Sequence, residues 1–467
     1  MAEALVLAAF ALSLAVGIAF GLSLLVPLAC GLALFVGYGL HRGHRLGELL
    51  RVAARGPLSI GRVLVLFVVI GMLTASWRAA GTIPAVTCLS VRLVSPSTLP
   101  LASFVLCGLM STMTGSSFAA SATVGVVCMT IATAMRADVL IVGGAIISGS
   151  FLGDRCSPMS STAMLVSTIT HSSLRENLGR MLRISVVPVV ACALIYAALG
   201  PAAGGAGMAP SFRGSFATSF DLSWYVLAPI ALVLVLSLAK LSVLRTMLAS
   251  LASALLLCVF AQHVPLGELP GILLFGFRTS NLAIGRMVNG GGVLSMTEIA
   301  LIVAVASSYS GLFEETGLLR GIRAFVRRLA ARTTPFAGVL VTSVVTACIA
   351  CDQVVSLMLT AQLCDEIEGD GSALALDLSS SAAIIPAVIP WTTSCVGLCA
   401  FVGMPTGSAA YAFLCMLIPL WTLVVSLWQR RHPGFALQRG GRVLGLDARD
   451  DARLIGHEVP AKLAEAS

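Results

Sequence analysis

The chain alternates between long apolar segments without charge and short clusters of basic residues. Apolar windows of about 17 to 25 residues, the length that crosses about 30 Å of hydrocarbon, recur from Leu5 to Trp428. None of them shows the strict apolar and polar alternation of a half-buried strand. The pattern therefore predicts an all-α polytopic membrane protein with about 10 to 12 transmembrane helices.

The chain begins with apolar sequence over residues 4–40, which is long enough for two helices with a turn around residues 17–21. It has no basic leader segment and no small-residue cleavage site after a short apolar core, so we expect a retained pair of helices and not a removed signal peptide. Residues 41–56 then carry four arginines, and we expect a cytoplasmic loop there.

Further basic clusters at residues 171–183, 320–332 and 430–442 are also expected on the cytoplasmic side. The stretch 200–220 is rich in Gly, Pro, Ala and Ser and is expected to be an external connection. These assignments place both chain ends in the cytoplasm. They divide the chain into a helix pair with a loop (1–60), a first repeat (61–200), a connection with two helices (201–297), a second repeat (298–428) and a cytoplasmic tail (429–467).

The two repeats are expected to be inverted, because the first enters the membrane from the cytoplasm and the second from outside. Each contains a proline that is followed, after one spacer, by three hydroxyl residues, in the segments 157–162 and 389–394. Pro158 and Pro390 remove a backbone donor and are expected to break their helices. Inverted repeats with re-entrant hairpins and broken helices place a binding site at their interface.

Composition excludes several classes of protein. With 58% hydrophobic and 11% charged residues and a mean hydropathy of +0.98, the chain is too apolar for a soluble enzyme. The net charge of +8 comes from arginines between spans, so we expect a lipid bilayer as partner and no nucleic acid. The pair Cys348 and Cys351 has no second pair or histidine at ligand spacing, so we expect core packing and no cofactor.

The strongest candidate site follows the residues 139–153, which carry no charge. Asp154 and Arg155 come next, and a charge at membrane depth costs about 2.5 to 3.5 kcal/mol, so it is retained mainly along an interior pathway. Hydroxyl groups that could help to bind an ion follow in Ser157, Ser160, Ser161 and Thr162. Arg155 is either a gating group or the charge partner of Asp154.

Other candidate residues lie in both halves of the chain. Asp352 follows a long uncharged stretch and is either a second site acid or a loop acid just past a helix end. Ser116 and Ser117 lie in a hydroxyl-rich segment that is either re-entrant or a helix-packing surface. The remaining candidates are the hydroxyls Thr392 and Thr393 and the acid Glu314, which ends an apolar span.

With these residues in hand, the chain resembles the NhaC family of Na+/H+ antiporters, whose relatives include Na+-linked malate/lactate exchangers. The resemblance covers roughly residues 60–427. The matching motifs, in order, are Gly81 to Pro84, Thr114 to Ser117, Thr123 to Val126, Gly144 to Gly149, Gly153 to Arg155, Ser157-Pro158, Gly292 to Met296, Gly311 to Gly317, Asp352-Gln353 and Ile389 to Thr392.

The resemblance implies an ion transporter that works by alternating access and often forms homodimers. It also implies exchange of Na+ for H+, sometimes with an organic acid. Asp154, Glu314 and Asp352 correspond to acidic positions of the family pattern. Two positions depart from it, since Ser161 stands where the pattern has an acid and Ser380 where it has an arginine.

The leading hypothesis is therefore a secondary active transporter in a prokaryotic plasma membrane, with Asp154 and Asp352 binding Na+ or a proton in turn. The alternative is Na+- or H+-coupled transport of a small organic anion or amino acid, with Arg155 meeting its carboxylate. A membrane hydrolase lacks support, because no nucleophile has a general base within the apolar spans. Sequence does not exclude a passive channel.

Overall fold

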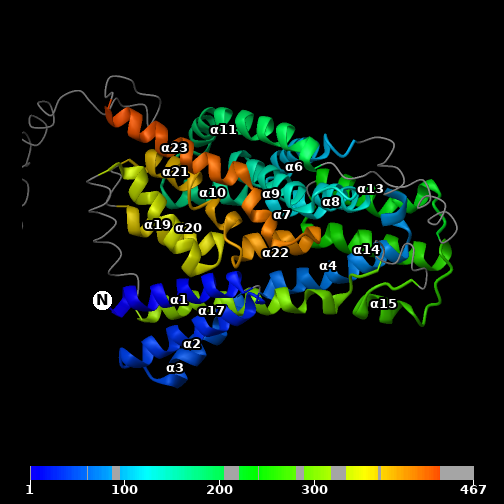
Figure 1. The fold of residues 1–467 in the computed structure, drawn as a ribbon, viewed down its shortest axis with the longest axis horizontal. Coiled ribbons are helices and arrows are strands. Elements are labelled where there is room, and N and C mark those ends of the chain that lie inside the picture. The colour runs from blue at the N-terminus through cyan, green and yellow to red at the C-terminus, as the bar shows by residue number, and fades with distance from the viewer. Residues whose placement is uncertain are drawn as a thin grey trace, which may run out of the picture.

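The computed structural model describes nine stretches of the chain, and all structural statements below concern them. They are residues 2–20, 22–59, 61–86, 95–203, 220–239, 241–279, 289–316, 333–365 and 370–431. Helices dominate these stretches, which contain no strand, although one isolated β-bridge joins Phe277 to Gly290. The prediction of an all-α fold is confirmed (Figure 1).

The helices of the first half and the connection follow one another closely. They are α1 (Ala2–Ala19), α2 (Leu25–His41), α3 (Leu46–Ser59), α4 (Gly61–Ala79), α6 (Leu99–Thr114), α7 (Ser117–Ala120), the π-helix η1 (Ser121–Gly125), α8 (Val126–Ala134), α9 (Val139–Cys156), α10 (Ser161–Ile169), α11 (Leu174–Ala203), η2 (Trp224–Leu227), α13 (Ala228–Leu238), α14 (Val243–Phe260) and α15 (Leu269–Phe275).

The second half contains η3 (Val293–Met296), α17 (Thr297–Thr316), α19 (Pro335–Ala350), α20 (Gln353–Cys364), α21 (Gly371–Ser380), η4 (Ile385–Val388), α22 (Thr393–Val402), η5 (Thr406–Tyr411) and α23 (Phe413–Arg431).

Both halves contain the same order of elements. A helix, α4 or α17, is followed by a helical hairpin, then by a helix broken in its middle, then by a long helix, α11 or α23. The first hairpin is α6 with α7, η1 and α8, and the second is α19 with α20. The broken helices are α9 with α10, and α21 with α22.

Contacts between the halves show that matching elements run in opposite directions. The α-carbon of Gly56 lies against Ser307, and that of Gly71 lies against Gly292, so α3 and α4 run antiparallel to the segment that contains η3 and α17. Gly371, at the start of α21, likewise lies on Thr170, which follows the end of α10. Inverted halves are the arrangement that the sequence predicted.

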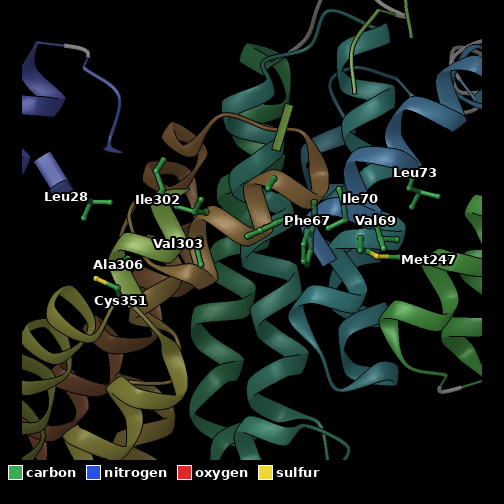
Figure 2. Close-up of a cluster of buried hydrophobic side chains, with 14 of the residues drawn as sticks. Leu28, Phe67, Val69, Ile70, Leu73, Met247, Ile302, Val303, Ala306 and Cys351 are labelled. Carbon is green, nitrogen blue, oxygen red and sulfur yellow. The ribbon is translucent and has the colours of Figure 1, made fainter. Parts of the chain in front are cut away.

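Two large hydrophobic clusters hold these elements together. One cluster joins α2, α4, α14 and α17 to the tip of the second hairpin, and Figure 2 shows Leu28, Phe67, Met247, Val303 and Cys351 among its members. The other joins α6, α8, α9 and α11 to α22 and α23. Both clusters contain residues from the two halves, and Cys351 at the tip of the second hairpin belongs to the first cluster.

The basic segment 41–56 differs from expectation, because most of it belongs to helix α3 and not to a loop. Leu49 and Ala53, one turn apart, are buried, while Arg51 and Arg55 are exposed. This amphipathic pattern, with Leu49 packed on Gly39, explains why the segment forms a helix. The parts of the expected basic and external loops at 204–219, 317–332 and 432–467 lie outside the described residues.

Length agrees with spanning helices in several cases. Five helical segments of the described chain are long and apolar enough to cross a membrane: 139–156, 174–203, 243–260, 371–388 and 406–431. Shorter apolar helices of 10 to 17 residues make up both hairpins and the half-helix α22. The half-helix α9, by contrast, has the 18 residues of a span on its own.

Candidate functional site

The two hairpin tips have matching backbone geometry. At the first tip, Gly115 has a left-handed conformation with φ of 69°, and Ser116 is extended with φ of −147°. At the second, Cys351 has φ of 55° and Asp352 has φ of −133°. In each tip the left-handed residue ends one helix and the extended residue begins the next, because its side chain accepts backbone N–H groups of the new helix.

The two helix breaks also share one chemical device. Pro158 has no N–H for the carbonyl of Asp154, four residues earlier, and Pro390 likewise has none for the carbonyl of Pro386. Ser160 donates its hydroxyl to the first carbonyl, and Thr392 donates its hydroxyl to the second. The same two side chains then accept N–H groups at the start of α10 and α22. Each hydroxyl therefore bonds a carbonyl ahead of the proline and begins the next half-helix.

Each hairpin tip lies on the break of its own half. In the first half, the Ser157 hydroxyl donates to the carbonyl of Thr112 at 2.7 Å, and Gly115 is so close to the backbone of Met159 that a side chain would not fit. In the second half, the backbone N–H of Thr393 donates to the carbonyl of Cys351 at 2.7 Å. A hydrogen bond from Gln353 of the second tip to Asp154 of the first half joins the two pairs, and we call the two tips and two breaks together the central layer.

Asp154 lies in this layer and receives hydrogen bonds from both halves. Its side chain is 5% exposed. The Oδ2 atom accepts from the Thr162 hydroxyl at 3.2 Å and from the Gln353 amide Nε2 at 3.2 Å, and the carboxylate also interacts with the backbone N–H of Ser117. The acid therefore lies between the first break and the tips of both hairpins.

Asp352 begins α20 at the second tip. Its Oδ1 accepts the N–H groups of Val354 and Val355, while Oδ2 accepts the Thr393 hydroxyl at 3.0 Å. The side chain is half-buried, and the next residue is the Gln353 that reaches Asp154. Asp352 is thus both a helix cap, as the loop-acid alternative implied, and a neighbour of the central layer.

Of the two roles considered for Arg155, a gating group or the charge partner of Asp154, the structure does not show the pair. Its guanidinium is 1% exposed and donates to the carbonyl of Ser379 at 2.8 Å, to the hydroxyl of Ser380 at 2.9 Å and to the hydroxyl of Ser185. α21 ends at Ser380, so the cation lies at the negative end of that half-helix as well as in the last turn of α9. Arg155 therefore places its positive charge beside Ser380.

The other predicted residues occupy different places. Ser117 is buried at the start of α7, Ser161 is exposed at the start of α10, and both prolines lie within the breaks. Glu314 belongs to the last turn of α17, and its side chain lies outside the described part of the structure. The structure thus brings Asp154, Thr162 and Ser117 together but not Ser161.

Sequence reasoning missed two buried polar residues. Gln353 was noted only as part of a motif, although an amide within an apolar span is itself a signal. Asp377 is fully buried in α21, where an acid in an apolar helix is a similar signal.

The donor set is suited to a hard cation. Within the described residues, no group of three or more His, Cys, Asp or Glu side chains could hold a metal. The central layer instead offers a carboxylate with hydroxyl and backbone carbonyl oxygens, which are the ligands that hard cations prefer.

Comparison with known proteins gives a matching family model and several relatives. The model of the Na+/H+ antiporter family matches residues 1–177 and 171–428. A malate-2H+/Na+-lactate antiporter of Bacillus subtilis is 24% identical, with 79% of this chain and 81% of the relative aligned. The Na+/H+ antiporter NhaC of the same species is 26% identical over 78% and 83% of the two chains. The arginine/ornithine antiporter ArcD of Halobacterium salinarum is 28% identical over 79% of each.

Proposed function

Because the chain belongs to the Na+/H+ antiporter family, we propose that it exchanges Na+ for H+ and that Asp154 carries either ion. The observation that supports this role is the position of the carboxylate, which is buried and held by Thr162 of one half and Gln353 of the other. A group that both halves contact can be exposed to either side as they move.

Burial explains why one acid can exchange two ions. A bare charge in a desolvated site is costly, so a carboxylate there is stabilised when a cation or a proton neutralises it. The two ions compete for the same oxygens, and the hydroxyl of Thr162 can turn to offer its own oxygen to a cation. Exchange of the two ions then follows if the carrier opens from one side of the membrane to the other mainly when a cation or a proton has neutralised Asp154.

Asp352 takes a supporting role in this proposal. Its Oδ1 is committed to the N–H groups of α20, which leaves Oδ2, now bonded to Thr393, for an ion. The negative charge also lies next to the residue that contacts Asp154. Asp352 would therefore attract a cation toward the central layer and stabilise the second hairpin at the same time.

The geometry disfavours an organic anion at Arg155. All three guanidinium nitrogens already donate to protein oxygens of α11 and α21, and the group is buried. A substrate carboxylate would have to replace these bonds. The names of two relatives nevertheless include organic substrates, so malate, lactate, arginine and ornithine belong in the assay as competing substrates.

The test is transport by the purified protein in proteoliposomes that carry an imposed pH gradient. We expect Na+ or Li+, but not K+, to dissipate the gradient, with rates that saturate. Transport of an organic solute without any dissipation by Na+ would contradict the proposal. A rate that stays linear with concentration and ignores the counter-ion gradient would indicate a channel instead.

We also propose that the protein lies in a prokaryotic plasma membrane as a homodimer, with both chain ends in the cytoplasm. The arginine clusters of α3 and of the start of α11 support this orientation. Single cysteines at Arg51 and Arg175, on a background without cysteine, should be labelled only from the inside. A cysteine at Trp224, an exposed residue at the start of η2 in the connection between the two repeats, should be labelled from outside. Reversed labelling would contradict this topology.

A further inference from the structure

The side-chain amide of Gln353 joins three elements of the central layer. It is 8% exposed, and its Nε2 donates to Asp154 Oδ2 at 3.2 Å and to the carbonyl of Ala383 at 2.6 Å. Gln353 belongs to the second hairpin tip, Asp154 to the first broken helix and Ala383 to the second break. One nitrogen therefore connects the two halves through the proposed ion-carrying acid.

The chemistry of that nitrogen conflicts with a bound cation. Asp154 Oδ2 already accepts two donors, from Thr162 and Gln353, so its lone pairs point at protein hydrogens. A cation at this oxygen must displace at least one donor. The Thr162 hydroxyl can rotate and become an acceptor, whereas an amide NH2 group can only donate. The amide hydrogens would face a cation bound at this oxygen, and turning the amide over would set its oxygen against the carbonyl oxygen of Ala383, so Gln353 is the group that must withdraw.

We propose that Gln353 stands in for the transported cation at Asp154 while the carrier is empty and leaves when the cation binds. Its departure breaks the bond between the first broken helix and the second hairpin, while the bond to Ala383 keeps Gln353 with its own half. Cation binding thereby releases one half from the other. This inference rests on the proposed role of Asp154 and makes Gln353 a positioning residue for the exchange.

The first test is Gln353→Met, which keeps a similar length but has no N–H group. Removing a competing hydrogen bond to a charged oxygen should tighten Na+ binding by about tenfold. Turnover should fall, because the empty carrier has lost the bond that closes it. Equilibrium binding of radioactive Na+ to purified protein measures the first effect, and initial transport rates measure the second. A purely structural role would lower the rate without tightening binding.

The chain offers a matched control in Gln262, which donates to the carbonyls of Ala80 and Asp221, away from the central layer. Gln262→Met should leave Na+ affinity unchanged. Unchanged or weaker Na+ binding in a well-folded Gln353→Met protein would overturn the inference.

A second variant keeps the test decisive if Gln353→Met folds poorly. Gln353→Lys places a permanent cation beside Asp154 and should abolish Na+ binding while it keeps the two halves joined. Normal Na+ binding in this variant would also overturn the inference. If Asp154→Asn bound Na+ as tightly as the wild type, the proposed function itself would fail, whatever Gln353 does.

Discussion

Replacing Asp154 by Asn tests the central acid with little change in shape. The amide oxygen can still accept from Thr162 and Gln353, but the new NH2 group cannot accept a hydrogen bond as the second carboxylate oxygen does. A buried donor that loses its acceptor in this way costs about 1 to 3 kcal/mol. That cost is small enough for us to expect normal insertion and yield.

The loss of charge has a much larger effect on the ion. At about 4 Å and an effective dielectric constant of about 20, one unit charge contributes roughly 4 kcal/mol to the binding of a monovalent cation. Because about 1.4 kcal/mol corresponds to a tenfold change, Asp154→Asn should weaken Na+ binding by about a thousandfold. The variant also cannot carry a proton, so exchange should stop.

The assay compares Na+-driven dissipation of a pH gradient in proteoliposomes with equal amounts of protein. The control is Asp138→Asn, the same chemical change at the other end of α9. Asp138 begins that helix and accepts the N–H groups of Leu140 and Ile141, a role that Asn fills equally well. The control should transport normally. Full exchange by the Asp154 variant would refute the reasoning and make this acid structural.

Three further substitutions test Asp352 and Ser161 near the central layer and Asp221 outside it. Asp352→Asn should reduce apparent Na+ affinity and slow coupled exchange while the helix cap persists, and coupled uptake at the wild-type rate would assign this acid to structure alone. Ser161→Asp adds a carboxylate at the start of α10, where a negative charge is favourable, so protein yield should be unchanged. The added charge lies next to Thr162, which contacts Asp154, so apparent Na+ affinity should rise although Ser161 itself lies outside this group; unaltered affinity would show that a charge at this position does not reach the cation. At Asp221, before η2, hydrogen bonds from the hydroxyls of Ser223 and Tyr225 hold the pKa of the carboxyl below its usual range. The carboxylate therefore stabilises the fold at neutral pH, and this stabilisation is lost as pH falls through the lowered pKa. Thermal unfolding of Asp221→Asn should show a weaker loss of stability in acid than the wild type, and an identical acid profile would contradict this.

The features that could be predicted from the sequence depend on neighbours along the chain. A proline followed by hydroxyls indicates a helix break, because the missing N–H and the group that compensates for it lie within six residues. An acid within an apolar span is equally visible. Asp154, Pro158 and Pro390 were therefore identified before any contact was known.

The features that were missed depend on contacts between distant segments. Gln353 reaches Asp154 across 199 positions of sequence, and Arg155 reaches Ser379 and Ser380 across 224 and 225. No local pattern predicts toward which neighbouring helix the Arg155 guanidinium points. Its position next to Asp154 made a charge pair one of two alternatives, but Arg155 lies instead at the negative end of α21.

The two halves share their backbone devices but not their charges. The hydroxyls of Ser160 and Thr392 compensate for the prolines in the same way, yet Asp154 of the first break corresponds to Pro386 in the second. At the tips, Asp352 corresponds to Ser116. The acidic groups thus come from the first break and the second tip, which belong to different halves. A relative movement of the halves can change the distance between these groups, and such a change is what a carrier needs in order to bind an ion in one state and release it in the other.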